Sequence, residues 1–327
     1  YSSAASDVYK RQNVHSLGAL THGVSLVRTI KSRNTFSATS VDQLPHQLIA
    51  MLLYGHQFLL PVPDIDRTDL LVLVGNNPMA SNGSIMTVPD FPGRLRELKA
   101  RGGRLVVIDP RRSETADLAV TSGHGFHLQV KPGTDAFCLA AILAVVVQEG
   151  LVHTDWVRDH VTGWEAVVAE FAAVSVGEYA ARCGVDEELL RAATRRIAGA
   201  DSVAVFEDLG VQMNRQSTLN SYLEKLVWLL TGNLGNVGGQ YAPSALVSLI
   251  GSGKAGKGPG RVSPVTGSRI ISGLMPCNVI ADEILTDHPK RFRAMIVESG
   301  NPAHSLADSQ RMRQALRALD ILSLIHI

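Results

Sequence analysis

Five short segments combine glycine or proline with small polar and charged side chains, directly after apolar runs. They read GNNPMAS from Gly75, IDPRRSET from Ile108, VKPGTD from Val130, EDLGVQ from Glu207 and SGNPAHS from Ser299. Glycine allows a backbone to approach a diphosphate closely, while helix N-termini, Asn and Ser supply hydrogen bonds to it. A single such segment more often does no more than end a strand. Five of them, each at the same position relative to the run that precedes it, favour a site for a dinucleotide.

Charged side chains within these segments suit the parts of a nucleotide. Asp109 directly follows an apolar run, so its carboxylate is placed to accept hydrogen bonds from ribose hydroxyls. Arg111 or Arg112 can meet a phosphate. Asp135 can accept from the N1 and N2 hydrogens of guanine. Each of these roles requires elements that carry the side chains to one edge of the fold.

The elements predicted around these segments alternate between strand and helix. Continuous apolar runs indicate strands that are buried on both faces. Such runs lie at 70–74 and 105–108, and further strands are predicted at 127–130, 202–206 and 292–297. Helices are predicted at 92–101, 134–148, 217–231 and 307–319, and residues 154–200 are predicted to be helical throughout. This alternation predicts an α/β fold, with a parallel-sheet, Rossmann-like dinucleotide-binding domain that has helices on both faces of the sheet.

Composition excludes several other classes of protein. The 327 residues are 45% hydrophobic and 19% charged, which is typical of a soluble globular protein of about two domains. The net charge of +1 offers no strong field for nucleic acid or for an anionic membrane. The longest apolar run, 136–147, is shorter than the roughly 20 residues of a membrane-spanning helix. Three well-separated cysteines exclude a disulfide framework, and within this stretch they exclude an iron–sulfur or zinc knuckle.

Other motifs give weaker signals. The segment GSGKAGK at 251–257 fits half of a phosphate-binding loop, but Gly258 stands where Ser or Thr should hold magnesium. His124 and His127 have no third metal ligand nearby in the sequence. The GxSxG elbow of a serine hydrolase does not occur. The five strand-end segments therefore form the best candidate site.

The two ends of the chain are interpreted as foreign to the protein. Residues 2–12, SSAASDVYKRQ, and residues 322–327, LSLIHI, match the translation of one transposon sequencing adapter, read from its two strands. We therefore expect 1–12 and 322–327 to be adapter artefacts and the natural part to be an internal fragment. Within it, we expect 13–232 to form the dinucleotide-binding α/β domain and 233–321 to form a truncated second, related α/β domain.

Longer stretches around the same segments resemble the molybdopterin oxidoreductases of the dimethyl sulfoxide reductase family. They read GNNPMASNG, VVIDPRRSETA, VKPGTDAFCLAA, LLTGNLGNVGG and VESGNPAHSLAD, and the resemblance covers nearly all of 13–321. It implies the catalytic subunit of a bacterial enzyme in which two molybdopterin guanine dinucleotides (bis-MGD) hold one molybdenum or tungsten. Such a metal supplies two-electron redox chemistry, often with transfer of an oxygen atom. The fragment is expected to be inactive alone.

The resemblance also implies site residues. One dinucleotide would be bound by Gly75, Asn76, Asn77, Ser81, Asp109, Arg111, Gly133, Asp135, Gly210 and Gln212, and the site for the second would begin at Gly300, Asn301 and Pro302. The protein ligand of the metal is expected within residues 32–46, where no cysteine occurs. Ser40 and Asp42 are the candidates for this catalytic position, and Asp42 is the expected ligand. The alternative for Asp42 is that it only caps the helix that follows.

The resemblance implies a further choice between substrates. Formate dehydrogenases of the usual kind carry a cysteine or selenocysteine ligand and an arginine about one helix before the TGN segment. In an ungapped count back from Thr231, Tyr222 stands at the arginine position, while Arg215 and Lys225 are the nearest basic residues. An oxygen ligand such as Asp42 suits a metal that cycles oxo groups. We therefore expect oxygen-atom transfer rather than formate oxidation.

Two functions from different classes stay open. The first is a redox enzyme for a small oxyanion, N-oxide or sulfur compound, with an iron–sulfur cluster or subunit as its electron partner. The second is a non-catalytic scaffold in an electron-transfer complex, like the large iron–sulfur subunit of respiratory complex I. The intact segments around Asp109 and Asp135 favour the first. The compartment, cytoplasm or periplasm, stays open as well.

Overall fold

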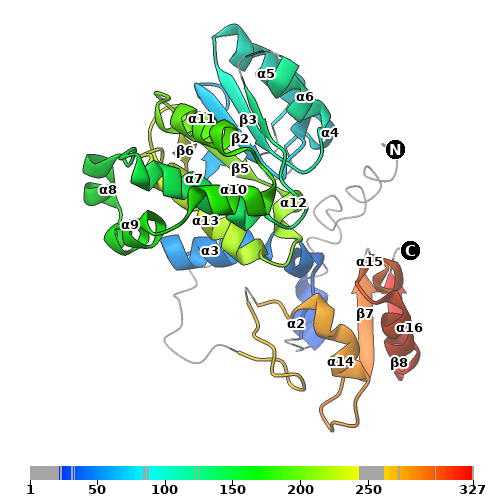
Figure 1. Cartoon of the computed structure of the whole chain (residues 1–327). Helices are drawn as coiled ribbons and strands as arrows, with labels where there is room; N and C mark the ends of the chain where they lie inside the picture. Colours follow the sequence, from blue (N-terminus) through cyan, green and yellow to red (C-terminus); the bar gives the residue numbers. More distant parts are fainter. Residues whose placement is uncertain are drawn as a thin grey trace. The chain divides into compact units, whose positions relative to one another are not determined.

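The computed structural model describes residues 22, 24–30, 32, 34–83, 86, 88–121, 123, 125–242, 261–271, 273–298 and 300–325. The chain divides into two compact units, and each is described by itself (Figure 1). The larger unit comprises residues 42–255, and the smaller unit comprises residues 1–41 together with 256–327.

A parallel sheet forms the centre of the larger unit, and Figure 1 labels β2, β3 and β5 in it. The sheet has four strands in the order β4-β3-β2-β5. The strands are β2 (Leu70–Val74), β3 (Arg104–Ile108), β4 (Phe126–Leu128) and β5 (Val203–Glu207). Every residue of β2 and β5 is buried, because these strands are covered on both faces. Val74 is in register with Ile108 on one side and Glu207 on the other, so the carboxyl ends of three strands lie level. The predicted α/β fold with a parallel sheet is confirmed.

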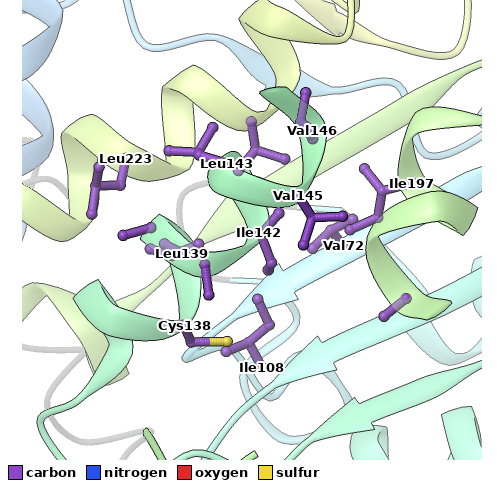
Figure 2. Packing of buried hydrophobic residues seen from close by; sticks show 14 of the residues in the cluster. Val72, Ile108, Cys138, Leu139, Ile142, Leu143, Val145, Val146, Ile197 and Leu223 are labelled. Carbon is purple, nitrogen blue, oxygen red and sulfur yellow. The ribbon is translucent and has the colours of Figure 1, made fainter. Parts of the chain in front are cut away.

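Helices cover both faces of this sheet. One face carries α7 (Asp135–Gln148), α10 (Val176–Cys183), α11 (Glu187–Ala198) and α13 (Ser217–Leu230), and the other carries α5 (Phe91–Ala100) and α6 (Glu114–Thr121). The two cores use alternate residues of each strand, so that Val72 belongs to the first core and its neighbour Leu71 to the second. Figure 2 shows Ile142 of α7 gathered with Val72 and Ile108 in the first core.

Shorter elements complete the larger unit. They are α3 (Leu44–Tyr54), β1 (Val62–Pro63), α4 (Pro78–Ser81), α8 (Thr154–His160), α9 (Trp164–Ala172), α12 (Leu209–Gln212) and β6 (Gln240–Tyr241). Helix α3 packs on α13, where the rings of Tyr54 and Trp228 stack with centroids 6.4 Å apart. β1 and β6 pair antiparallel, and this pairing holds residues 233–242 to the larger unit. The sequence placed a domain boundary after residue 232, and the division of the whole protein into domains stays a prediction.

The smaller unit contains another strand–loop–helix passage. Its elements are α2 (Val24–Ile30), η3 (Ala38–Val41), η5 (Cys277–Val279), α14 (Ile280–Ile284), β7 (Ala294–Glu298), α15 (Pro302–Ser305), α16 (Ser309–Arg317) and β8 (Ile321–Ile325). Strands β7 and β8 pair in parallel. Helix α16 begins two residues after the predicted position, because the side chain of Asp308 accepts a hydrogen bond from the amide of Arg311 at 3.0 Å and caps the helix.

Residues 322–325, which the sequence analysis assigned to an adapter, lie in β8. They pair with β7 through the backbone, while the side chains of Leu322 and Leu324 are 37% and 45% exposed. Residues 1–12 and 326–327 lie outside the described residues, and the adapter assignment stays a prediction. None of the helices formed by the described residues is long and apolar enough to cross a membrane.

Candidate cofactor-binding site

The candidate site lies at the carboxyl edge of the four-stranded sheet. Gly75 follows β2, Asp109 follows β3 and Asp208 follows β5, while residues 131–135 lead from β4 into α7. Because the strands are parallel and in register, these four segments converge at one edge of the sheet. The fifth segment, around Gly300, follows β7 in the smaller unit.

Two of these segments interlock through glycines. The amide of Gly210 donates to the carbonyl oxygen of Gly75 at 3.0 Å. A Cβ atom on Gly75 would lie 2.7 Å from the amide nitrogen of Val211, and Gly75 also has a φ of +58°. The absence of side chains therefore permits this contact and fixes the loop after β2 against the loop after β5.

Asn76 is buried at this junction without a hydrogen-bond partner. Its side chain is 1% exposed, and neither its amide nitrogen nor its oxygen has a partner among the described residues. An unpaired buried amide costs about 1–3 kcal/mol. A buried amide without a protein partner is a candidate contact for a polar ligand or an ordered water.

Its neighbour Asn77 has protein partners instead. Asn77 Nδ2 donates to Glu114 Oε2 at 2.9 Å, and the hydroxyl of Thr115 donates to Asn77 Oδ1 at 2.6 Å. The hydroxyl of Ser81, which is exposed, donates to the carbonyl oxygen of Asn77 at 3.3 Å. Asn77 thus holds the loop to α6, and Ser81 keeps an exposed hydroxyl at the end of α4.

Asp109 and Arg111 present opposite charges after β3. Asp109 Oδ1 accepts from the amide of Arg111 at 2.7 Å, and burial raises the pKa of the Asp109 carboxyl despite this bond. The side chain of Arg111 is 71% exposed and pairs with Glu114 at 3.4 Å. Exposed pairs of this kind contribute little stability, so the guanidinium can exchange Glu114 for a phosphate. Arg112 pairs with Asp117 at 2.7 Å.

His127 supports the same segment. Its Nε2 atom lies 2.9 Å from the carbonyl oxygen of Asp109. The described part of the chain has no group of three or more His, Cys, Asp or Glu that could hold a metal ion. His124 and the segment at 251–257 lie outside the described residues.

Asp135 is a buried carboxylate at the start of α7. It is 4% exposed, and its Oδ2 accepts from Asn214 Nδ2 at 3.0 Å. Burial raises its pKa, and the charge of Asp109 adds to this effect. The two carboxylates therefore lie close enough to interact. Gly133, in the turn before Asp135, has a φ of +77° and open space around its Cβ position.

Asp42, the expected metal ligand, is half-buried before α3. Burial, together with the charge of Asp208, raises the pKa of Asp42 to about 6. The N-cap of α3 is Gln43, without a side-chain capping bond. The alternative that Asp42 only caps this helix therefore disagrees with the structure.

Ser40 has partners in the smaller unit. Its hydroxyl donates to the carbonyl oxygen of Ser37 at 2.9 Å and accepts from the amide of Cys277 at 3.0 Å. The Cys277 thiol donates to the same Ser37 oxygen at 3.1 Å, and burial raises its pKa. Sequence analysis missed this cysteine as a neighbour of the ligand segment, because 240 residues separate it from Ser37 and no spacing signal connects them.

Gln212 is the last residue of α12 and is 4% exposed. Its side-chain nitrogen lies 3.4 Å from Nδ1 of His46, which belongs to α3. Sequence analysis also missed His46, which lies just inside the segment searched for a metal ligand. The structure thus brings Gly75, Asn76, Gly210 and Gln212 to one edge together with Asp109 and Asp135.

The loop before α15 repeats the geometry of the loop before α4. Asn301 has φ −125° and ψ 86°, close to the φ −120° and ψ 75° of Asn77. Each asparagine is followed by a buried proline, Pro302 or Pro78, that begins a helix of four residues. Gly300 and Asn301 are exposed. The repeated sequence therefore folds into the same local structure in both units.

The chain is similar to several known proteins. A family model described as molybdopterin oxidoreductase matches residues 6–326. The F420-dependent formate dehydrogenase subunit alpha of Methanocaldococcus jannaschii is 25% identical over 275 residues, which cover 80% of this chain and 39% of that protein. The assimilatory nitrate reductase catalytic subunit of Bacillus subtilis is 25% identical over 203 residues, which cover 62% of this chain and 26% of that protein.

A solved structure shares the fold. The acetylene hydratase of Pelobacter acetylenicus superposes with a TM-score of 0.74 and 16% identity, covering 90% of this chain and 43% of that one. At this identity the likeness concerns the fold. The chain spans less than half the length of each of these proteins.

Proposed function

The chain belongs to the molybdopterin oxidoreductase family, and from this membership we propose that the carboxyl edge of its central sheet binds the nucleotide part of a molybdopterin guanine dinucleotide. The buried amide of Asn76, which has no hydrogen-bond partner among the described residues, carries the proposal. A ligand with both donors and acceptors would satisfy its two polar atoms and remove their desolvation cost. The contact between Gly75 and Gly210 holds the loop that carries Asn76 against α12, which ends at Gln212.

Each charged residue of the edge has a part in this proposal. Asp135 accepts from the N1 and N2 hydrogens of guanine, and burial makes that pair of hydrogen bonds worth more than it would be in water. Asp109 accepts from ribose hydroxyls. Arg111 exchanges its exposed pair with Glu114 for the diphosphate.

The metal is proposed to take Asp42 as its protein ligand. When bound, the molybdenum or tungsten centre supplies two-electron redox chemistry. The half-buried Asp42 offers a hard oxygen donor, whereas burial keeps the Cys277 thiol protonated and therefore a poor ligand. This donor favours oxygen-atom transfer to or from a small oxyanion, N-oxide or sulfur compound.

Formate is the alternative substrate, because several of the relatives are formate dehydrogenases or their alpha subunits. Lys225, one of the two nearest basic candidates for holding a formate carboxylate, is 1% exposed and paired with Glu207 at 2.9 Å. It is therefore engaged inside the fold. Arg215 is exposed, but it stands seven residues before Tyr222, which is the position expected for the formate-binding arginine, and Tyr222 itself is half-buried. This set supports oxygen-atom transfer over formate oxidation.

A second dinucleotide is proposed to begin its site at Gly300, Asn301 and Pro302. The support is the backbone geometry that Asn301 shares with Asn77. Electrons are proposed to come from an iron–sulfur partner; the support for a partner subunit is that the Methanocaldococcus jannaschii relative is by its name a subunit alpha. Asp42 would hold the metal at which the small-molecule substrate would react.

The test uses the full-length protein. We expect elemental analysis to find molybdenum or tungsten and mass spectrometry of the released cofactor to find a guanine nucleotide. Asp135→Asn should lower the nucleotide content, while Asp155→Asn, at an 84% exposed side chain, should leave it unchanged. A correctly folded protein with neither metal nor guanine nucleotide would contradict the proposal and favour a non-catalytic scaffold.

A further inference from the structure

Four ionisable side chains lie together inside the larger unit, behind the edge that carries the candidate site. His46 belongs to α3, Glu207 ends β5, and Glu224 and Lys225 belong to α13. None of the four is more than 3% exposed. Burial of charged groups costs several kcal/mol for each ion unless partners compensate it. Buried groups with strong mutual interactions are concentrated at functional sites.

Direct contacts connect the four groups. Lys225 Nζ lies 2.9 Å from Glu207 Oε1 and 3.4 Å from Glu224 Oε2. His46 Nδ1 lies 3.4 Å from the same Glu207 oxygen. The hydroxyl of Ser221 also donates to that oxygen. Glu207 is therefore the centre of the cluster and the principal partner of the ammonium group.

Counting charges shows that this cluster is neutral only if one group besides Lys225 also carries an added proton. Two ionised carboxylates and one ammonium group leave a net charge of −1 if the imidazole is neutral. A net charge that is buried away from solvent, in a medium of low dielectric constant, is strongly unfavourable. One added proton makes the cluster neutral, and it must reside on His46, Glu207 or Glu224.

The contacts assign that proton to Glu224. Glu207 accepts from Lys225 at 2.9 Å and from Ser221, and both bonds stabilise its ionised form. Glu224 has the longer contact to the ammonium group, at 3.4 Å. Burial raises the pKa of Glu224 to about 8, and the charge of Glu207 adds to this effect. Burial and the charge of Lys225 lower the pKa of His46 to about 3, so its imidazole is neutral.

The surroundings of Glu224 contain no further compensating charge in the part of the chain that the structure describes. The groups that face it or the rest of the cluster are His46 and Tyr54 from α3, Glu207 from β5, Gln212 from α12, and Ser221, Lys225 and Trp228 from α13. Burial, followed by the charges of Glu224 and Glu207, raises the pKa of Tyr54, so this phenol stays protonated. Lys225 is thus the fixed positive charge.

The cluster touches the candidate site at two points. His46 lies 3.4 Å from Gln212, a proposed cofactor-binding residue. Glu207 directly precedes Asp208, whose charge acts on Asp42. A change of charge at the site therefore acts on the cluster at short range, through protein of low dielectric.

We propose that Glu224 is a buried carboxylic acid that loses or gains its proton as the charge of the adjacent cofactor site changes. When the site becomes more positive, the O–H bond of the Glu224 carboxyl breaks, H⁺ leaves to solvent and the carboxylate pairs with Lys225. When the site becomes more negative, H⁺ returns to the same carboxylate. Glu224 is thus a positioning and charge-balancing residue, and its coupling to the site rests on the proposed function.

Infrared spectroscopy of the full-length protein tests the first part of the proposal, the protonation of Glu224, without the metal. Cofactor-free protein at pH 7 should show the C=O stretch of a buried protonated carboxyl, and the band should disappear as the pH rises through about 8. Glu224→Gln should abolish the band, and the control Glu188→Gln, at an exposed position of α11, should retain it. Glu207→Gln should also abolish it at pH 7, because Lys225 then has Glu224 as its anionic partner. A wild-type protein without the band, or a band that persists in Glu224→Gln, would overturn the assignment.

Redox titration of the full-length protein with its metal and cofactor bound tests the coupling between Glu224 and the cofactor site. Between pH 7 and pH 9 the midpoint potential of the metal centre should vary with pH less in Glu224→Gln than in the wild type or in Glu188→Gln. Equal pH dependence in all three proteins would overturn the coupling even if the infrared band is present. A protein that binds no metal would instead contradict the proposed function, and the infrared result would stand separately.

Discussion

Gly75 and Gly210 lie in contact at the carboxyl ends of β2 and β5, with the amide of Gly210 bonded to the carbonyl oxygen of Gly75 at 3.0 Å. A Cβ atom on Gly210 would lie 2.6 Å from that oxygen. This contact fixes the spacing of two loops, one carrying the buried Asn76 and the other leading to Gln212. The contact between the two glycines therefore sets where the sheet places Asn76 relative to Gln212.

The first prediction concerns this contact. Gly210→Ala should lower the free energy of unfolding by about 1–3 kcal/mol, because the new methyl group overlaps backbone that cannot rotate away. Denaturant unfolding measures the difference. Gly300→Ala is the matched control, since its Cβ atom would lie 3.8 Å from its nearest neighbour, and it should change stability by under about 0.5 kcal/mol. Equal effects of the two substitutions would contradict a tight backbone contact between Gly75 and Gly210.

The second prediction concerns recognition of guanine. Cofactor-free full-length protein should bind guanosine diphosphate more tightly than inosine diphosphate, because inosine lacks the N2 hydrogens that Asp135 accepts. Asp135→Asn should weaken guanosine diphosphate binding by about 1–3 kcal/mol and abolish the preference. Calorimetric titration measures both. A variant that keeps the preference would show that Asp135 serves only the structure of α7 and its bond to Asn214.

The third prediction concerns the metal ligand. X-ray absorption of the loaded protein should show no sulfur beyond the dithiolene atoms of the cofactor, because Asp42 supplies oxygen. Asp42→Cys should add one metal–sulfur contact, and Ser40→Ala should leave the metal shell unchanged. An additional sulfur in the wild type that disappears in Cys277→Ser would identify Cys277 as the ligand and overturn the assignment.

The fourth prediction concerns the substrate. The full-length enzyme should reduce an N-oxide, sulfoxide or oxyanion and should not oxidise formate, because Lys225 is held in a buried ion pair and Tyr222 lacks a positive charge. Steady-state assays with formate and with a panel of oxygen-atom acceptors and donors measure this. Formate oxidation together with an additional metal–sulfur contact would refute it.

The fifth prediction concerns pH and stability. The pKa of His46 is lowered from 6.5 to about 3 in the folded protein, so between these values the unfolded chain binds a proton that the folded chain does not. The free energy of unfolding should therefore fall as the pH falls below 6.5. The free energy of unfolding should decrease between pH 6.5 and pH 5 by roughly 1–2 kcal/mol less in His46→Gln than in the wild type.

Denaturant unfolding at the two pH values measures this effect, and the exposed His288 provides the control His288→Gln. Glu224 acts in the opposite sense. Its raised pKa makes the folded state bind the extra proton, so its contribution to stability is lost as the pH rises from 4.5 to about 8. Identical pH dependence in wild type and His46→Gln would contradict a neutral, buried imidazole.

Sequence by itself determined the elements and the edge at which they meet. The apolar run 70–74 coincides with β2 residue for residue, and the predicted strands and helices at 105–108, 134–148 and 217–231 differ from β3, α7 and α13 by at most one residue at either end. Such runs are local signals, because a strand covered on both faces needs apolar side chains at every position. Since parallel strands end at the same edge, the order of elements also predicted that Gly75, Asp109 and Gly210 would converge.

Tertiary structure alone decided which of these groups are buried, paired or unpaired. The unsatisfied amide of Asn76, the approach of Cys277 to Ser37 and the ion pair between Lys225 and Glu207 each depend on packing between segments distant in the sequence. Sequence spacing gives the face of a helix or strand on which a side chain lies, but not the neighbour that covers it. Burial sets the cost of a charge and therefore its protonation, which is why the protonation proposed for Glu224 could not be inferred from the sequence.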